Sequence, residues 1–234
     1  MQLIGPAEQP FENELDVIQS LVDLEGARIL ELGCGAAEKT QQLVALAPTL
    51  SITASEVDLI QHEKNLANAI ERVTFKSYGA EAIDEADASF DGVMMFKSLH
   101  HVPLDQLDQA FSEIERALKP GGWVYISEPV FAGAFNEVIR IFHDEEHVRK
   151  EAFAAIERAV ASERFNLSEE RFFLTRIKMN HFQQFEDRLL NVTHTEHNLT
   201  DAQYQEVQRR FESNRSDEGF VFDIPNRVDL LSLR

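Results

Sequence analysis

The 234-residue chain is short of cysteine, of basic side chains and of long apolar runs, and each shortage excludes a class of protein. Its single cysteine, Cys34, has no partner for an internal disulfide bond, so a cytoplasmic, reducing location fits best. No run approaches the roughly 20 apolar residues that a membrane-spanning helix needs. The first ten residues lack the basic start and apolar stretch of a secretory signal, and we expect none.

Basic residues are scarce relative to acidic ones. The sequence has 22 Lys and Arg against 41 Asp and Glu, a formal net charge of −19, and no basic block. A nucleic-acid-binding protein needs a basic face that displaces counterions from phosphates. We therefore expect neither nucleic acid nor an anionic membrane as a partner, and we interpret the charge as a solvated surface.

Internal repeats and low-complexity tracts are also absent, and the length suits one large domain or a domain with an insertion. Short, nearly continuous apolar runs occur at 28–33, 50–56, 72–77, 91–97 and 122–128. Such runs are typical of strands buried on both faces of a parallel sheet. Apolar residues at helical spacing occupy 11–24 and 104–118. This alternation predicts an α/β fold with a doubly wound sheet.

The pattern changes after residue 129. Residues 134–163 predict two helices, and residues 200–213 predict a helix that Thr200 opens. Residues 220–233 predict one or two terminal strands, in which Pro225 favours an edge or a break. Residues 171–179 are compatible with more than one structure.

The glycine-rich run "ELGCGAAEK" (31–39) follows the first predicted strand. A dinucleotide-binding fold carries G-x-G-x-x-G, but here Gly33 and Gly35 are followed by Glu38 in the third position. Glu31 and Glu38 would repel a phosphate, and no Gly-Lys-Ser/Thr of a P-loop is present. A ligand with an ammonium, a sulfonium and no phosphate suits this loop better. Glu31 can hold the ammonium, and the two glycines allow a close backbone approach.

The end of the second predicted strand carries Glu56, 21 residues after Gly35. A carboxylate at this place accepts hydrogen bonds from ribose hydroxyls. Asp58 is the alternative residue for this role. In so acidic a chain, Glu56 can also be interpreted as an ordinary surface acid.

Four segments together resemble a known family. "ILELGCGAAEKT", "ITASEVD", "YGAEAIDEADASFDGVMMFKSLHHV" and "RALKPGGWVYISEP" occur in order over roughly residues 25–128. On these segments the chain resembles the class I S-adenosylmethionine-dependent methyltransferases. The resemblance implies a mostly parallel, seven-stranded Rossmann-like sheet with an antiparallel last strand, and S-adenosyl-L-methionine across the carboxyl ends of the first strands. It also implies in-line methyl transfer to a small-molecule acceptor.

The resemblance assigns cofactor contacts by position. The methionine part, the ribose, the adenine and the amino acid end would be lined by Glu31, Gly33, Cys34, Gly35, Glu56, Val57, Ala80, Glu81, Lys97 and Ser98. One position departs from the family. Relatives with a "GDAE"-like run place an Asp before the Ala, where this chain has Gly79, so Glu81 or a main-chain carbonyl would have to contact the adenine amino group.

The segment "KSLHHVP" places His100 and His101 just past the fourth predicted strand, where the transferred methyl should point. Either imidazole can orient the acceptor or take its proton, and we predict these two residues as catalytic. The alternative is that one of them packs or caps the strand end.

The segment "FHDEEH" reads H-x-x-E-H, which resembles the zinc motif of inverted zincins. On a helix, His143 and His147 would share a face. A methyltransferase scaffold is the wrong context for a peptidase, so we expect no metal. The two histidines are either part of a solvated helix or, together with Glu128, residues of the substrate pocket. Metal binding between this pair and the His100–His101 loop is the third alternative.

The chain is thus predicted to have three parts. Residues 1–129 form the cofactor-binding core, 130–200 a mainly helical cap over the acceptor site, and 201–234 a C-terminal helix and strands that complete the sheet. An NAD-type Rossmann oxidoreductase and a cofactor-binding protein without transferase activity are the alternative functions. The acceptor atom, the roles of His194 and His197, and the oligomeric state stay open.

Overall fold

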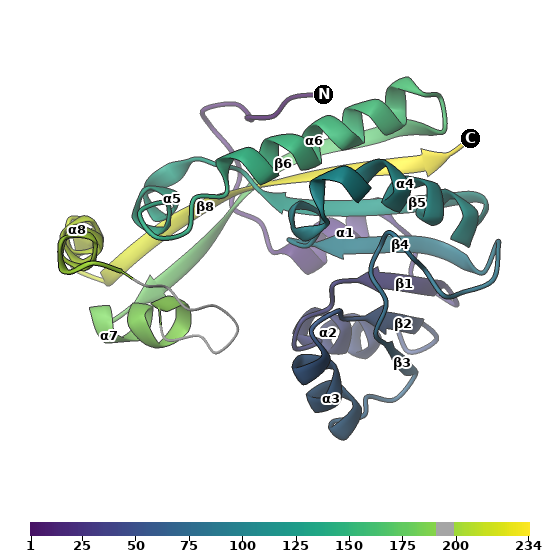
Figure 1. Cartoon of the computed structure of the whole chain (residues 1–234), viewed down its shortest axis with the longest axis horizontal. Coiled ribbons are helices and arrows are strands. Elements are labelled where there is room, and N and C mark those ends of the chain that lie inside the picture. Colours follow the sequence, from purple (N-terminus) through teal and green to yellow (C-terminus); the bar gives the residue numbers. More distant parts are fainter. Residues whose placement is uncertain (191–198) are drawn as a thin grey trace.

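The computed structural model describes residues 1–190 and 199–234, and one sheet runs through this part of the chain (Figure 1). Its strands are β1 (Arg28–Leu32), β2 (Ser51–Ser55), β3 (Val73–Lys76), β4 (Phe90–Phe96), β5 (Leu118–Pro129), β6 (Phe165–Met179), β7 (Arg215–Ser216) and β8 (Gly219–Leu233). The order is β3-β2-β1-β4-β5-β8-β6, and β7 pairs with β8 off this path. The first five strands pair in parallel, whereas β8 is antiparallel to both β5 and β6. The α/β fold is confirmed; the two-residue β7 is an addition to the seven expected strands.

Helices cover both faces of the sheet (Figure 1). They are α1 (Glu14–Leu21), α2 (Glu38–Leu46), α3 (Leu59–Ala67), α4 (Leu107–Ala117), α5 (Gly133–Ile139), α6 (Glu146–Ala161), α7 (Phe182–Phe185) and α8 (Asp201–Glu212). Short 3₁₀ turns occur at Leu99–His101 and Leu104–Gln106, and a π-helical turn at Glu186–Leu190. None of the described helices is long and apolar enough to cross a membrane.

Two apolar cores flank the sheet because successive side chains of a strand point to opposite faces. In β4, Val93 and Met95 pack into the core under α4 and α6, whereas Met94 packs into the core under α1 and α2. Helix α4 contributes Phe111 and Ile114, which lie one turn apart on its buried face. This double layer fixes the strand ends, and therefore the loops that follow them.

A third apolar core lies where β6 and β8 extend past β5, covered by α5, α7 and α8 (Figure 1). Phenylalanine rings fill it: Phe182, Phe185, Phe211, Phe220 and Phe222. Thr200 opens α8 as predicted, because its hydroxyl accepts from the Gln203 N–H while the Gln203 side chain accepts from the Thr200 N–H.

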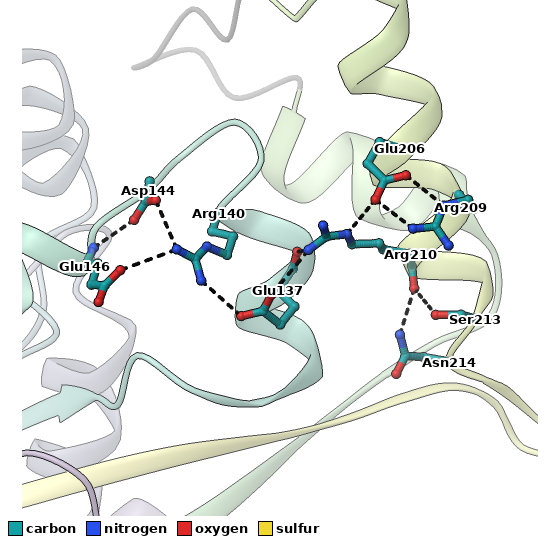
Figure 2. A network of polar contacts seen from close by, with 9 residues as sticks. All are labelled: Glu137, Arg140, Asp144, Glu146, Glu206, Arg209, Arg210, Ser213 and Asn214. Carbon is teal, nitrogen blue, oxygen red and sulfur yellow. Dashed lines mark hydrogen bonds and ion pairs between the residues drawn. The ribbon is translucent and has the colours of Figure 1, made fainter.

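Arginine side chains tie this third core to the rest of the chain. Figure 2 shows Arg210 of α8 contacting the carboxylate and main-chain carbonyl of Glu137 in α5. Arg140, just after α5, contacts Asp144 and Glu146 at the beginning of α6. The helices around the third core are therefore joined to α6, whose N-terminal end adjoins the histidine pair described below.

The structure settles two points that the sequence left open in the second half of the chain. The ambiguous residues 171–179 belong to β6, and residues 220–233 form a single strand, β8, in the interior of the sheet. Pro225 does not break β8: it pairs with Leu174 of β6, and pairing of β8 with β5 begins only at the next residue, Asn226. Leu174 makes its main-chain hydrogen bonds to Pro10 and Glu12, away from β8. Pro225 thus lies at a local edge, where its missing N–H breaks no ladder bond.

The division of the chain at residues 129 and 200 stays a prediction. His194 and His197 lie outside the described residues.

Candidate functional site

The loop after β1 is built on two glycines with left-handed backbone. Gly33 has φ +74° and Gly35 has φ +53°. A Cβ at Gly33 would come within 2.6 Å of the Ser98 Cβ, while Gly35 faces open space. Ser98 also donates a hydrogen bond through Oγ to the Leu32 carbonyl, at 2.7 Å. The loops after β1 and β4 are therefore in direct contact, and Gly33 is what permits it.

Glu56 lies immediately after β2, as predicted, and its carboxylate is fixed from two sides. Oε2 accepts from the Gly35 N–H at 2.8 Å, and Oε1 accepts from the Asp58 N–H at 2.9 Å. A carboxylate offers about four acceptor positions, so both oxygens keep capacity for ligand hydroxyls. Val57, the next residue, is 62% exposed. Asp58 is the N-cap of α3 and accepts from Ile60 N–H, which makes it the weaker candidate for the ribose.

Glu31 lies in β1 and is almost fully buried, with Thr40 of α2 donating a 2.7 Å hydrogen bond to its Oε2. Burial raises the pKa of Glu31 to about 7 although the Thr40 hydrogen bond opposes this shift. Burial, followed by the nearby carboxylates of Glu31 and Glu56, raises the pKa of the Cys34 thiol to about 12. Cys34 thus stays a thiol and serves packing rather than nucleophilic chemistry.

Asn65 is a site residue that the sequence did not reveal. Its buried amide reaches from α3 and donates a 2.8 Å hydrogen bond to the Gly35 carbonyl. Gly35 is therefore held by Glu56 through its N–H and by Asn65 through its carbonyl. An asparagine in a polar helical segment carries no sequence signal for this contact.

The region expected near the adenine contains buried Ala80 and half-buried Glu81. The Glu81 carboxylate lies directly against Gly79, in the space that a side chain at residue 79 would fill. This placement supports the prediction that Glu81 compensates for the missing aspartate.

Lys97 directly follows β4 and has a left-handed backbone conformation, with φ +54°. This conformation is costly for a residue with a side chain. Its N–H donates to the Ser127 carbonyl of β5 at 2.7 Å, and its side chain is exposed. The turn redirects the chain so that Ser98 faces the Gly33 loop and the histidines follow at the carboxyl end of the sheet.

His100 is buried and joined to Glu128, which lies in β5. The Nδ1 atom of His100 contacts Glu128 Oε2, and Glu128 Oε1 accepts from the Leu99 N–H at 2.9 Å. Nε2 of His100 lies 3.5 Å from Glu145 Oε1. Burial alone would lower the pKa of His100, but the charges and hydrogen bonds of Glu128 and Glu145 outweigh it and raise the pKa to about 9. His100 is therefore protonated at neutral pH.

His101 is exposed, and its ring centroid lies 4.1 Å from that of His100. Loss of hydration and then the positive charge of His100 lower the pKa of His101. Adjacent histidines thus differ in charge at neutral pH: His100 carries a proton between two carboxylates, and His101 keeps a nitrogen lone pair.

The predicted pairing of His143 with His147 on one helical face is wrong. Helix α6 begins only at Glu146, so His143 lies in the preceding turn. Its Nε2 atom is 2.9 Å from Glu145 Oε1, and Glu145 in turn contacts His100. His147 is exposed on the first turn of α6. The H-x-x-E-H spacing is consequently interrupted by a helix boundary, and the structure brings His143, without His147, toward His100.

Comparisons with known proteins agree with this architecture. Residues 29–122, which span β1 to the middle of β5, match the family model for a methyltransferase domain. The chain is 32% identical over 136 residues to the O-methyltransferase rstn1 of Aspergillus nomiae, covering 55% of this chain and 59% of that protein. Both findings agree with the resemblance of residues 25–128 to the class I S-adenosylmethionine-dependent methyltransferases.

Solved structures share the fold of this chain over nearly its whole length. A Bacillus halodurans protein has a TM-score of 0.63 at 17% identity, covering 94% of this chain and 98% of that chain. A Haemonchus contortus phosphoethanolamine N-methyltransferase, solved with phosphomonomethylethanolamine and S-adenosylhomocysteine, has a TM-score of 0.53 at 18% identity, covering 92% of this chain and 50% of that chain. The chain spans about half the length of the curated relatives it matches.

Proposed function

We propose that this chain transfers a methyl group from S-adenosyl-L-methionine to an oxygen atom of a small-molecule acceptor. The observation that carries the proposal is the meeting of two features at the carboxyl ends of the parallel strands. A glycine loop clamped by Glu56 lies there, and the loop is joined through Ser98 to the segment that carries His101. Oxygen is favoured as the accepting atom because the relative rstn1 is named an O-methyltransferase.

The loop residues fit this cofactor on chemical grounds. Gly35 leaves open space beside the Glu56 carboxylate, which retains acceptor capacity for ribose hydroxyls. Glu31 is a buried carboxylate that a ligand ammonium would neutralise. The cofactor supplies an electrophilic methyl on its sulfonium, and the protein has to hold the acceptor oxygen in line and remove its proton.

His101 is the better candidate for the proton acceptor. Its lowered pKa leaves the imidazole neutral at neutral pH, so a nitrogen lone pair is available to the acceptor hydroxyl. His100 has the opposite role, because its proton is held between Glu128 and Glu145. We infer that His100 is a positioning residue whose charge adds to the loss of hydration in lowering the pKa of His101.

A small pocket at the end of β5 adjoins Glu128, and we propose that it receives part of the acceptor. Val130, Phe131, Arg149, Lys150 and Arg227 are among its lining residues. Acidic Glu128 and Glu146 line the same pocket, so its mixture of apolar and charged groups favours an acceptor with an apolar body and polar groups.

The decisive experiment is a screen of hydroxylated small molecules, with and without a carboxylate, for release of S-adenosylhomocysteine. We expect turnover with at least one acceptor, loss of turnover in His101→Gln, and retained cofactor binding in that variant. A larger thermal stabilisation by NAD than by S-adenosylhomocysteine would instead support the oxidoreductase alternative. Tight S-adenosylhomocysteine binding without turnover across all acceptor classes would support a cofactor-binding protein that lacks transferase activity.

We also propose a cytoplasmic location and no nucleic-acid or membrane partner. A cytoplasmic location rests on the single cysteine, and the absence of nucleic-acid and membrane partners rests on the acidic composition.

A further inference from the structure

We propose that His100, His101 and Glu145 form a binding site for a divalent transition-metal cation, with Zn²⁺ as the ion that fits best. The sequence pointed to a zinc-like motif at His143 and His147, whereas the structure gathers a different set of residues. Two of the residues are adjacent in the chain, whereas Glu145 comes from the turn before α6, so the group exists only in the folded protein.

The distances suit a metal ion after small side-chain rotations. One ligand atom from each of the three residues lies within 4.8 Å of the others. Nε2 of His100 and Oε1 of Glu145 are 3.5 Å apart. Two ligands bound to zinc at about 2.0–2.2 Å and at a tetrahedral angle would be about 3.3–3.6 Å apart. The His100–Glu145 pair is therefore already close to the spacing that a shared cation requires.

Neighbouring groups orient the two buried ligands. Glu128 contacts Nδ1 of His100, which directs Nε2 toward Glu145; this is the carboxylate–histidine arrangement that commonly supports metal-bound imidazoles. Arg149 donates to Oε2 of Glu145 at 2.5 Å and so leaves Oε1 on the side of His100. Each of these two ligands is therefore held through one polar atom, and its second polar atom is directed toward the proposed cation.

The ligand set indicates the class of cation. Two imidazoles and one carboxylate suit Zn²⁺ and Co²⁺, whereas Mg²⁺ and Ca²⁺ prefer all-oxygen sites. Three protein ligands leave a fourth position, and the exposure of His101 places that position on the solvent side. His143, whose Nε2 lies 2.9 Å from Glu145 Oε1, would give up that contact when a cation takes this oxygen.

The competing interpretation is that protonated His100 merely bridges two carboxylates. A proton on Nε2 and a metal ion exclude each other at the same lone pair. Direct metal binding to the chain without cofactor or acceptor therefore separates the two interpretations, and it does so independently of any methyl transfer.

Occupancy would have one consequence that rests on the proposed function. A cation on His101 takes the lone pair that the acceptor hydroxyl needs, so bound Zn²⁺ should lower the rate of methyl transfer. The loss should be reversed by a chelator.

The test is a titration of the untagged, cofactor-free chain with Co²⁺, followed through its visible ligand-field bands and displaced with Zn²⁺. We expect one tight site per chain. His101→Gln and Glu145→Gln should each weaken it at least about tenfold. His147→Gln is the matched control, because it removes an exposed histidine two residues from Glu145 and should leave the affinity unchanged.

Equal Co²⁺ affinity in wild type, His101→Gln and Glu145→Gln would overturn the proposal, as would an equal loss in His147→Gln. Thermal unfolding of each variant shows whether it is folded, and exposed His101 can be replaced without disturbing a core. A chain that methylates an acceptor but binds no Co²⁺ would keep the proposed function and lose this site. A chain that binds Co²⁺ through these residues but shows no transferase activity would keep this metal site and lose the proposed function.

Discussion

Glu56 accepts a hydrogen bond from the Gly35 N–H at 2.8 Å, across 21 residues of sequence. The contact locks the end of β2 to the glycine loop before any ligand is present, and Asn65 secures the opposite side of the same residue. Such a preorganised carboxylate loses little conformational entropy when a ligand hydroxyl binds to it.

Replacing Glu56 by Ala should therefore weaken S-adenosylhomocysteine at least about tenfold, since two charge-assisted hydrogen bonds to ribose are worth about 1.5–3 kcal/mol each. Calorimetric titration measures the change. Asp58→Ala is the matched control: it removes the cap of α3, costs about 1 kcal/mol of stability and should leave the affinity near wild type. A larger affinity loss in Asp58→Ala would move the ribose contact to that residue.

Cofactor binding should depend on pH through Glu31. Its pKa is raised to about 7, so a fraction of the carboxyl is protonated near neutral pH. A bound ammonium favours the ionised form and lowers this pKa, so binding below about pH 7 requires loss of a proton. The affinity for S-adenosylhomocysteine should fall as pH decreases from about 8 to about 6. In Glu31→Gln the affinity should be lower and this dependence absent; an unchanged slope would place the ammonium elsewhere.

The two histidines should respond differently to the same substitution. His101→Gln should lower kcat by about 10²–10⁴-fold with little change in cofactor affinity, because it removes the proposed proton acceptor. In wild type, the rate should decline on the acid side only below the ordinary histidine pKa of about 6.5, because the pKa of His101 is lowered.

His100→Gln tests positioning through the pH profile. It removes the positive charge that, after loss of hydration, helps to hold the pKa of His101 down, while the carboxylates that raise this pKa remain in place. The acid limb of the rate profile should therefore shift to higher pH. A uniform loss of rate with no shift would indicate that His100 acts only through packing.

The third core should be important for stability but not for cofactor binding. Phe211 is fully buried against Phe182, Phe185 and Phe220. Phe211→Ala should cost about 3–5 kcal/mol of unfolding free energy, measured by denaturant titration. Phe11→Ala is the control, because Phe11 is 54% exposed and its removal should cost far less. If Phe211→Ala weakens S-adenosylhomocysteine as much as Glu56→Ala does, the third core also shapes the cofactor site.

The sequence predicted β1 to β5 well because these strands are short and apolar on both faces, a pattern that depends on local residues alone. It did not resolve β6, whose 15 residues carry charged side chains such as Glu169 and Arg176 among the apolar ones. It left open whether Pro225 marks an edge or a break, because the place where β5 ends beside β8 depends on the tertiary structure.

The residues of the candidate site also fall into those that the sequence predicted and those that only the structure shows. Glu56 and the histidine pair were found from their places after strands, and the structure puts them there. Asn65 and Glu145 act through contacts with residues 30 and 45 positions away, respectively, which no motif encodes. The expected His143–His147 face failed because the helix begins three residues after His143.

The Glu137–Arg210 contact and the Arg140 contacts with Asp144 and Glu146 have a mechanical consequence (Figure 2). They place a chain of partly exposed ion pairs between the phenylalanine-rich end of β6 and β8 and the turn that carries Glu145. Ion pairs of this kind weaken as ionic strength rises, whereas the buried Glu128–His100 contact is shielded from bulk ions. Added salt should therefore weaken the ion pairs that hold the turn with Glu145, while the contact of Glu128 with His100 stays in place. The two carboxylates that share His100 would then differ in how firmly they are held.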